Sequence, residues 1–367
     1  MATALVFLLL CSLAGASADD ASTANIAASF VFGDSLVDAG NNNFLQTLSK
    51  ADIRPNGIDF TASGGEPTGR FTNGRTIADI VGEGLGTPNF AQPFLAPNTT
   101  GRVILNGVNY ASGGGGILNG TGQIFVNRLG LDIQIDYFNI TRKEVDKILG
   151  VSQAKLYFMK NAIISLTIGS NDFLNNYLLP LLSAGERYTE SPDSFVDQLI
   201  NSLRAQLTRL YSLDARKFVV ANVGPIGCIP YQRSINKLTQ TECVSLPNEL
   251  ASNYNGRLRT LLTELNQNLS GAKFCLADVY DLVYELVNNY QTYGFKSASS
   301  ACCGNEGQLA GILPCTPAST MCENRSDYVF WDSYHPSEAA NLIIGKFLVD
   351  GDTKYISPIN LRQLKDL

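Results

Sequence analysis

Short apolar segments alternate with longer amphipathic segments along most of the chain. Four runs are apolar almost throughout and are bounded by turn-forming residues, as expected of buried strands; they span 28–32, 161–168, 217–223 and 273–277. Between them, apolar residues recur every three or four positions, which is typical of helices that bury one face. The clearest of these patterns comprises Phe195, Leu199, Leu203, Leu207 and Leu210. This alternation predicts an α/β fold with a parallel sheet wrapped by helices.

The last helix and the ends of the strands extend this outline. Apolar residues between 339 and 348 predict a helix that begins after His335, with Pro336 in the first position, where no N–H is needed. Ligands of open parallel sheets bind beyond the carboxyl ends of the strands. The residues after the predicted strands, 33–35, 169–172 and the loop from 224, are therefore expected to share one edge. No repeat or Pro-rich linker divides the chain, so we expect a single domain over 19–367.

The composition disfavours several classes of protein. Of the 367 residues, 45% are hydrophobic and 16% are charged, which suits a globular core and argues against disorder. The formal net charge is −6, and the chain has no run of lysine or arginine. Nucleic acid and anionic membranes are therefore disfavoured as partners.

Residues 1–18 have the features of a secretory signal peptide. An apolar stretch ends before Ala16-Ser17-Ala18, a small-residue cleavage signal, although no Lys or Arg precedes the stretch. It is short for a membrane span, and no later segment is apolar enough to anchor the mature chain. Five Asn-x-Ser/Thr sequons agree with a secreted, extracellular glycoprotein; they lie at Asn98, Asn119, Asn139, Asn268 and Asn324.

The cysteines also favour an oxidising compartment. Cys11 leaves with the signal peptide, and four of the remaining seven cysteines crowd into a Gly/Pro/Ser-rich segment at 302–322. Disulfides are favoured over zinc because no Cys-x-x-Cys pair is present. Cys275 lies in an apolar run and is expected to stay free. Cys228 and Cys243 form a plausible pair, whereas the other four permit three pairings: Cys302, Cys303, Cys315 and Cys322.

The only histidine of the chain, His335, lies in the stretch VFWDSYHPSE. A serine hydroxyl needs a base to become a nucleophile, and Ser35, just after the first predicted strand, is placed to pair with this ring. Asp332 lies three residues before the histidine and could accept a hydrogen bond from it; Asp172 is the alternative carboxylate. No Gly-x-Ser-x-Gly motif is present, because position 37 is valine, so the α/β-hydrolase elbow is disfavoured.

An acyl-transfer site also needs donors for a developing oxyanion. Asn171 offers a side-chain amide, and the segment 109–116, which ends in four glycines, offers backbone amides. On its own the glycine run is more readily explained by a flexible loop. Trp331, Arg70 and Arg75 are interpreted as structural residues, and Asp34 and Asp38 as organisers of the turn around Ser35.

Several blocks together resemble GDSL-type esterases/lipases of the SGNH hydrolase superfamily. They are FVFGDSLVDAGNNN, GVNYASGGGGIL, TIGSNDF and FWDSYHPSE, in that order, with PTGRFTNGRTIAD and NVGPIGCIPYQR resembling the secreted plant branch. The resemblance covers nearly the whole mature chain. It implies a three-layer α/β/α sandwich with a five-stranded parallel sheet of the flavodoxin-like type. It also implies hydrolysis of carboxylic esters without a cofactor or metal, outside the cell in the apoplast or cell wall.

The resemblance assigns a role to each candidate residue. Ser35 corresponds to the nucleophile, His335 to the general base and Asp332 to the acid that orients it. The oxyanion donors correspond to the Ser35 amide, Gly114 and Asn171, with the exact glycine of 113–116 left open. The expected substrate is an acyl lipid or a related small-molecule ester. Carbohydrate deacetylases and cutin-building acyltransferases share the family, and a catalytically silent binding glycoprotein is the alternative of another class.

Overall fold

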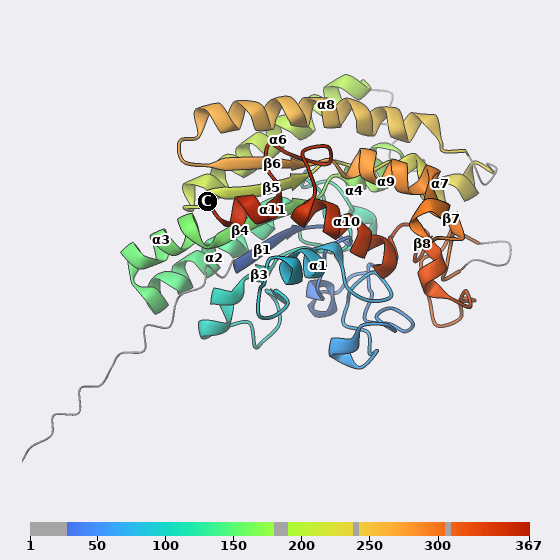
Figure 1. Ribbon diagram of the computed structural model, residues 1–367, viewed down its shortest axis with the longest axis horizontal. Coiled ribbons are helices and arrows are strands. Elements are labelled where there is room, and N and C mark those ends of the chain that lie inside the picture. The colour runs from blue at the N-terminus through green and yellow to red at the C-terminus, as the bar shows by residue number, and fades with distance from the viewer. Residues whose placement is uncertain (1–27, 180–189, 238–241, 305–309) are drawn as a thin grey trace, which may run out of the picture.

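The computed structural model describes residues 28–179, 190–237, 242–304 and 310–367, and a seven-stranded sheet lies at its centre (Figure 1). The strand order is β2-β3-β1-β4-β5-β6-β9, and every neighbouring pair is parallel except β6 and β9. The strands are β1 (Ala28–Gly33), β2 (Gln92–Pro93), β3 (Val108–Asn109), β4 (Ala162–Thr167), β5 (Lys217–Ala221), β6 (Lys273–Ala277) and β9 (Ile356–Ser357).

Five of these strands reproduce the expected core. Numbered among themselves in chain order, β3, β1, β4, β5 and β6 follow the order 2-1-3-4-5 of flavodoxin-like sheets. The four strands predicted from apolar runs are therefore confirmed, with ends that differ by at most two residues. The two-residue strands β2 and β9 extend the sheet at its edges and were not foreseen.

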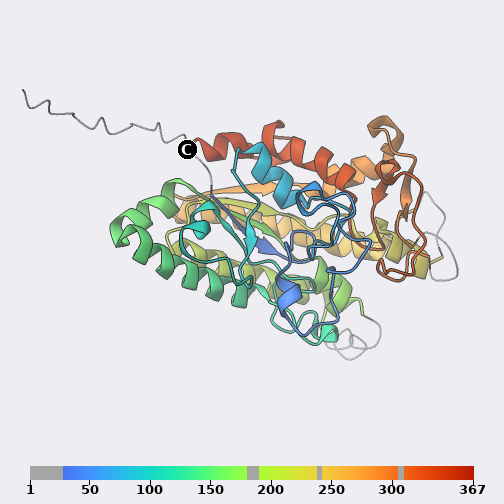
Figure 2. The same ribbon diagram turned by 90° about the horizontal axis from the view of Figure 1, so that it is seen from below.

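Helices cover both faces of the sheet (Figure 2). On one face pack α1 (Ile77–Gly84), α9 (Val279–Asn288), α10 (Glu338–Asp350) and α11 (Leu361–Lys365). On the other pack α2 (Leu131–Leu149), α3 (Val151–Lys160), α6 (Pro192–Ser212) and α8 (Ser245–Asn268). Shorter helices are α4 (Ser170–Asp172), a π-helical turn at Phe173–Tyr177 and α7 (Pro230–Ile235). The three-layer α/β/α arrangement agrees with the expectation.

Side-chain alternation along the strands divides the core into two layers. In β5, Phe218 and Val220 face the α6 and α8 side, whereas Val219 and Ala221 face the α10 side. Because both faces are covered, both sets are buried, and the strand is apolar after its first residue, Lys217. The predicted helix around Phe195 is confirmed as α6, and its apolar residues are buried.

The start of the last helix differs from the prediction. Helix α10 begins at Glu338, two residues beyond Pro336, and the Ser337 hydroxyl accepts a hydrogen bond from the Ala340 amide as its N-cap. Pro336 instead forms an isolated bridge with Phe330. A serine N-cap satisfies an otherwise unpaired amide, and this preference outweighs that of proline for the first helical position.

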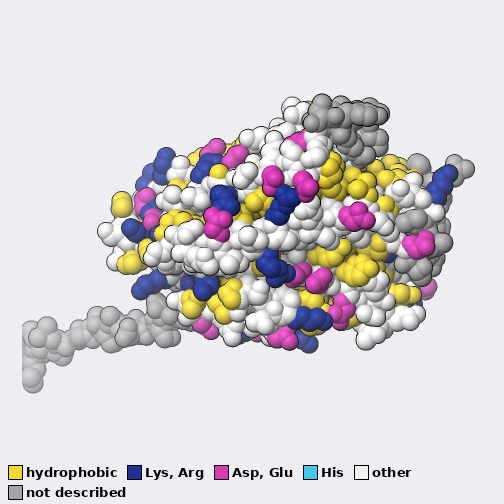
Figure 3. Space-filling view, turned by 90° about the horizontal axis from the view of Figure 1, so that it is seen from above, with side chains coloured by type: hydrophobic (Ala, Val, Ile, Leu, Met, Phe, Trp, Pro, Cys, Tyr) yellow, Lys and Arg dark blue, Asp and Glu magenta, His cyan; other side chains and the backbone are white. Residues whose placement is uncertain are grey.

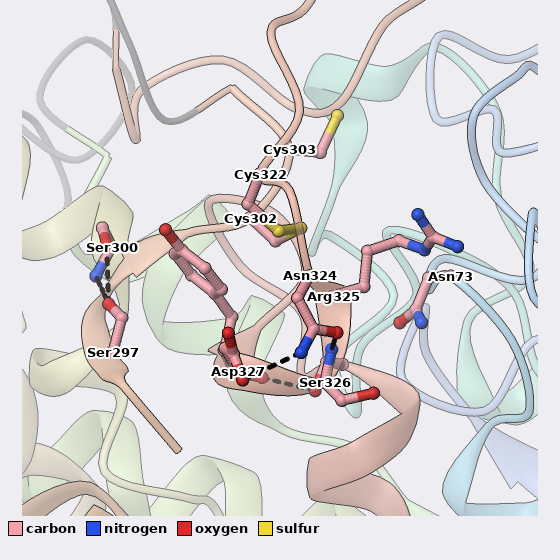
Figure 4. The surroundings of a disulfide bond; sticks show 12 residues. Asn73, Ser297, Ser300, Cys302, Cys303, Cys322, Asn324, Arg325, Ser326 and Asp327 are labelled. Carbon is pink, nitrogen blue, oxygen red and sulfur yellow. Dashed lines mark hydrogen bonds between the residues drawn. A yellow bond between two sulfur atoms is a disulfide. The ribbon is translucent and has the colours of Figure 1, made fainter.

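Three disulfides join cysteines in the described part of the chain, and their pairing resolves what the sequence left open. Cys228 is bonded to Cys243 as expected, and the clustered cysteines pair as Cys302–Cys322 and Cys303–Cys315. The last two cross-link the segment between β7 (Ser297–Ala301) and β8 (Tyr328–Phe330), which pair as a separate two-stranded sheet. Figure 4 shows this region, with Asn324 lying near the Cys302–Cys322 bond. Cys275 is free and buried, as predicted.

Two expectations concern the surface and the chain end. The proposed signal peptide, 1–18, lies outside the described residues. Within the ranges that the structure describes, no helix is long and apolar enough to cross a membrane. On the face in Figure 3, acidic and basic side chains are intermixed rather than gathered into one basic region.

Candidate active site

Ser35 lies in a tight turn directly after β1. The turn is closed by the Val37 and Asp38 amides, which both donate to the Asp34 carbonyl, and the Asp34 carboxylate accepts from the Leu36 amide. Gly33 is required just before it, because a Cβ there would lie 2.4 Å from the Thr167 carbonyl oxygen of β4. The close pairing of β1 and β4 thus fixes where the serine emerges from the sheet.

His335 bridges Ser35 and Asp332. Its Nε2 lies 2.8 Å from the Ser35 Oγ, and its Nδ1 lies 2.8 and 2.9 Å from the two carboxylate oxygens of Asp332. Asp332 and His335 are 3% and 7% exposed, so the hydrogen bonds between them are shielded from water. Ser35 lies 300 positions before His335 in the sequence, yet the two side chains and that of Asp332 are joined by continuous hydrogen bonds.

The loop that carries Asp332 and His335 is held on several sides. Asp332 accepts hydrogen bonds from the His335 and Tyr334 amides, which shapes the loop itself. The Ser333 hydroxyl donates to the Leu313 carbonyl at 2.6 Å, and the Ser333 carbonyl accepts from the Tyr231 amide. Leu313 lies in the segment closed by Cys303–Cys315, so that disulfide supports the loop.

Trp331 fastens the start of the same loop. It is fully buried beside the four paired cysteines, and its indole N–H donates to the Asn56 side chain at 2.9 Å. Its interpretation as a packing residue is confirmed. Arg70 and Arg75 make structural ion pairs with Asp79 and Glu338, also as expected.

The three residues expected to supply oxyanion donors line one cavity; they are Ser35, Gly114 and Asn171. No acceptor is found for the amides of Ser35 or Gly114 among the described residues, so both N–H groups are available to a ligand. Gly114 has φ +84°, and a Cβ there would meet the Phe125 ring at 2.5 Å. The Asn171 side-chain nitrogen donates to the Gly115 carbonyl and has a second proton to offer.

Two buried carboxylates hold the glycine-rich loop, which is ordered and buried from 111 to 117. Asp38 accepts from the Gly113 amide, and Asp172 accepts from the Ile117 and Leu118 amides and the Thr121 hydroxyl. The alternative in which Asp172 orients the histidine is therefore wrong, because its oxygens serve this loop. The glycine run is buried and hydrogen-bonded to both carboxylates, which favours a supporting role in the site over that of a flexible loop.

Burial also changes the acidity of three carboxyl groups beneath the site. It raises the pKa of Asp34 to about 7, against the opposing effects of the Leu36 amide and the nearby His335. It likewise raises the pKa values of Asp38 and Asp172 to about 6, although each accepts several hydrogen bonds. One Asp34 oxygen, Oδ2, is buried without a partner among the described residues.

Gln134 of α2 is a site-supporting residue that the sequence analysis missed. Its side chain accepts from the Gly33 amide and donates to the Gly33 carbonyl, at 2.9 and 2.8 Å. It therefore clamps the end of β1 just before the serine. The signal was present in the sequence: Gln134 is a polar residue on the apolar face that includes Leu131, Ile135 and Phe138.

A cavity of about 430 Å³ is lined by Ser35, Gly114, Asn171, Asp332 and His335. Its other lining side chains are mostly apolar, and Phe71 packs 5.3 Å from the His335 ring centre to centre. No cluster of His, Cys, Asp and Glu suited to a metal ion occurs within the described parts of the chain. Serine hydrolases use the same arrangement, in which a histidine is hydrogen-bonded to a serine on one side and to an aspartate on the other. Here it lies at the carboxyl edge of a parallel sheet.

Comparison with known proteins agrees with this class. The family model of GDSL-like lipase/acylhydrolase matches residues 30–348. GDSL esterase/lipase At2g23540 of Arabidopsis thaliana is 65% identical over 349 residues, covering 95% of this chain and 90% of the relative. GDSL esterase/lipase At3g50400 of the same plant is 62% identical over 343 residues, covering 93% and 92%. The chain therefore belongs to the GDSL esterase/lipase family, a family of carboxylic ester hydrolases.

Proposed function

We propose that the protein hydrolyses carboxylic esters through Ser35, His335 and Asp332. The observation that carries this proposal is the unbroken hydrogen-bond path from the Ser35 Oγ through the imidazole to the Asp332 carboxylate. Asp332 holds Nδ1 protonated, which leaves Nε2 free to take the serine proton. The Ser35 oxygen then attacks the ester carbonyl carbon, and the alcohol leaves with the proton held on Nε2. A water molecule, activated by the same nitrogen, releases the acid from the acyl-enzyme.

The negative charge that develops on the carbonyl oxygen is stabilised by three donors in this proposal. Among the described residues the Ser35 and Gly114 amides have no acceptor, and the Asn171 amide adds a side-chain donor. Fixed donors of this kind stabilise the transition state more than the ground state. The hydrogen bonds of Asp38 to the Gly113 amide and of Asn171 to the Gly115 carbonyl hold Gly114 between two anchored neighbours.

We propose that the substrate is an acyl lipid or related ester and that the protein is a secreted glycoprotein. The three disulfides support an oxidising compartment. Four of the five sequon asparagines are exposed, which supports glycosylation there: Asn98, Asn119, Asn268 and Asn324. Asn139 is half-buried in α2, and the Thr141 hydroxyl of its sequon is bonded to Tyr110. Attachment at Asn139 would therefore have to precede folding.

Hydrolysis of p-nitrophenyl butyrate by the purified protein and its Ser35→Ala variant tests the catalytic proposal. We expect kcat/KM to fall by about 10⁴-fold or more, because the nucleophile is lost. The matched control is Ser29→Ala, which removes a serine at the other end of β1, outside the cavity. Full turnover by Ser35→Ala would contradict the proposal, and loss of turnover by Ser29→Ala would indicate damage to the fold.

A further inference from the structure

The cavity extends well beyond the proposed catalytic residues, into the helical layer on the α10 side of the sheet. Its lining includes Asn341, Ile344 and Leu348, which share one face of α10. At a rise of 1.5 Å per residue these positions cover about 10 Å along the helix axis. The cavity therefore follows α10 for about two turns. Across from this face, the lining includes Val279 and Val283 of α9, four residues apart on a single helical face.

We call this part of the cavity the inner arm, and we define it by side chains from four elements. They are Ile77 of α1, Ala221 of β5, Val279 and Val283 of α9, and Ile344 and Leu348 of α10. All six are apolar. The three from α1 and α9 are only half-buried, although they belong to helices that pack on the sheet. Leu36, the residue after Ser35, lines the cavity as well and connects the inner arm to the proposed nucleophile.

Two polar residues beside the inner arm, Asn222 and Asn341, are engaged with the protein. The Asn222 side chain donates to Asp278 and accepts from the Tyr280 amide, and the Asn341 nitrogen donates to the Arg75 carbonyl. None of the six inner-arm side chains carries a charge. A polar head group placed here would lose its water without gaining partners, which is unfavourable. A hydrocarbon chain loses nothing of this kind, and each methylene removed from water strengthens binding by about fourfold.

Another part of the cavity combines apolar side chains with a basic one. Lys50 lines it and donates through its Nζ to the carbonyls of Asn42 and Asn43. Lys50 is the one basic side chain among the described residues that line the cavity apart from His335. Leu48, also in this lining, is 73% exposed and marks the opening to solvent. A polar alcohol can leave on this side because water is in reach.

We propose that the inner arm binds the acyl chain of the ester and that its length makes the enzyme selective for extended, unbranched acyl groups over acetyl. This inference rests on the proposed function, since the acyl carbonyl must reach the Ser35 Oγ. Ile344 and Leu348 on α10 and Val279 and Val283 on α9 form the walls that contact the chain. The side chain of Val283, which packs against both core layers, is the best placed to shorten the arm.

The test is a series of p-nitrophenyl esters, from acetate through butyrate and octanoate to dodecanoate, with kcat/KM measured for each. For the natural sequence we expect kcat/KM to rise from acetate to octanoate. Val283→Phe fills the arm and should lower the octanoate-to-acetate ratio by about tenfold, whereas Val283→Ala should raise the ratio for dodecanoate. Leu342→Phe, which adds the same ring to α10 at a residue 40% exposed and outside the cavity, is the matched control.

The possible outcomes separate this inference from the proposed function. If the unaltered protein hydrolyses esters but the ratio is the same in Val283→Phe and Leu342→Phe, the inner arm does not bind the acyl chain. If no ester is hydrolysed at any chain length, the proposed function itself fails. If Val283→Phe does not fold, as judged by circular dichroism, the opposite shift in Val283→Ala decides: its absence overturns the inference.

Discussion

The two halves of the proposed active site are built in different ways. Ser35, Gly114 and Asn171 follow β1, β3 and β4 of the central sheet, so strand pairing brings them together. Asp332 and His335 instead follow β8 of the small second sheet, which is separate from the central sheet although Val329 and Phe330 pack into the main core. The first half therefore inherits its geometry from the register of the fold. The second half depends on a loop-rich segment that buries little core of its own.

The means of support differ accordingly. In the nucleophile half, Asp38 and Asp172 accept hydrogen bonds from backbone amides of the glycine-rich loop. In the acid–base half, two disulfides cross-link the segment: Cys302–Cys322 and Cys303–Cys315. The Leu313 carbonyl also accepts a hydrogen bond from the Ser333 hydroxyl. Buried hydrogen bonds support the half that follows the central sheet, whereas disulfides reinforce the loop-rich segment that leads to Asp332 and His335. The following predictions test whether the halves are separable in this way.

The largest effect is expected from changing the carboxylate of the acid–base half. Asp332→Asn cannot hold the histidine Nδ1 protonated, so kcat/KM for p-nitrophenyl butyrate should fall by about 10⁴-fold. Steady-state kinetics measures this directly. Asp327→Asn, in the same segment but paired with Lys296, is the control and should stay within about twofold. Activity of Asp332→Asn close to that of the control would remove Asp332 from the mechanism.

The next effect concerns the covalent support of the same half. Replacing both Cys303 and Cys315 by serine opens a loop with a sequence separation of 12. Loop-closure entropy predicts a loss of about 3 kcal/mol in the free energy of unfolding. We also expect kcat to fall, because Leu313 is then no longer fixed under Ser333. Urea unfolding and kinetics measure the two effects, with Cys275→Ser as the control.

A double variant with unchanged stability and unchanged kcat would show that the acid–base half does not need its covalent link. Loss of stability without loss of kcat would show that the disulfide stabilises the fold without positioning the catalytic loop. This result would weaken the comparison between the halves. The Cys275→Ser control should keep its kcat, since that thiol is buried in β6 and does not line the cavity.

The smallest effect is expected in the nucleophile half and depends on pH. Burial raises the pKa of Asp34 to about 7, from an ordinary 3.8, so the folded protein binds this proton more tightly than the unfolded chain. The resulting stabilisation is complete below about pH 4 and is lost as the pH rises through 7. Asp34→Asn removes the titration, yet its side-chain oxygen can still accept from the Leu36 amide.

The difference in unfolding free energy between pH 4 and pH 8 should therefore be smaller in Asp34→Asn than in the natural sequence. Asp172 and His335 are the charged neighbours that act on Asp34, and Asp172 contributes a pH dependence of the same sign. Urea unfolding at the two pH values measures the change. An identical pH dependence in the variant and the natural sequence would contradict the assignment.

Those parts of the fold that bury long apolar runs could be predicted from the sequence. The strands β1, β4, β5 and β6 are covered on both faces, and continuous apolarity reveals them. The edge strands β2 and β9 have two residues each, too few for any periodicity to register. The start of α10 was placed too early because Ser337 and Pro336 are both acceptable near a helix start, and only the tertiary bridge to Phe330 distinguishes them.

The candidate site was predictable to the extent that residue type restricts the choice. A chain with one histidine leaves a single possible imidazole base, and the structure places His335 against Ser35. The pairing of the four clustered cysteines was not predictable, because adjacent Cys302 and Cys303 have the same local sequence environment. Gln134 was missed because a polar residue on an apolar helix face signals burial without naming its partner.

The measurement that most directly tests the central claim is covalent trapping of the nucleophile. A fluorophosphonate should react with the Ser35 Oγ, with loss of fluoride, because the His335 Nε2 at 2.8 Å accepts the serine proton. Peptide mass spectrometry should then find one adduct, on Ser35, absent from Ser35→Ala and much slower to form in His335→Ala. An active protein that is labelled at another residue, or not labelled at all, would contradict the mechanism.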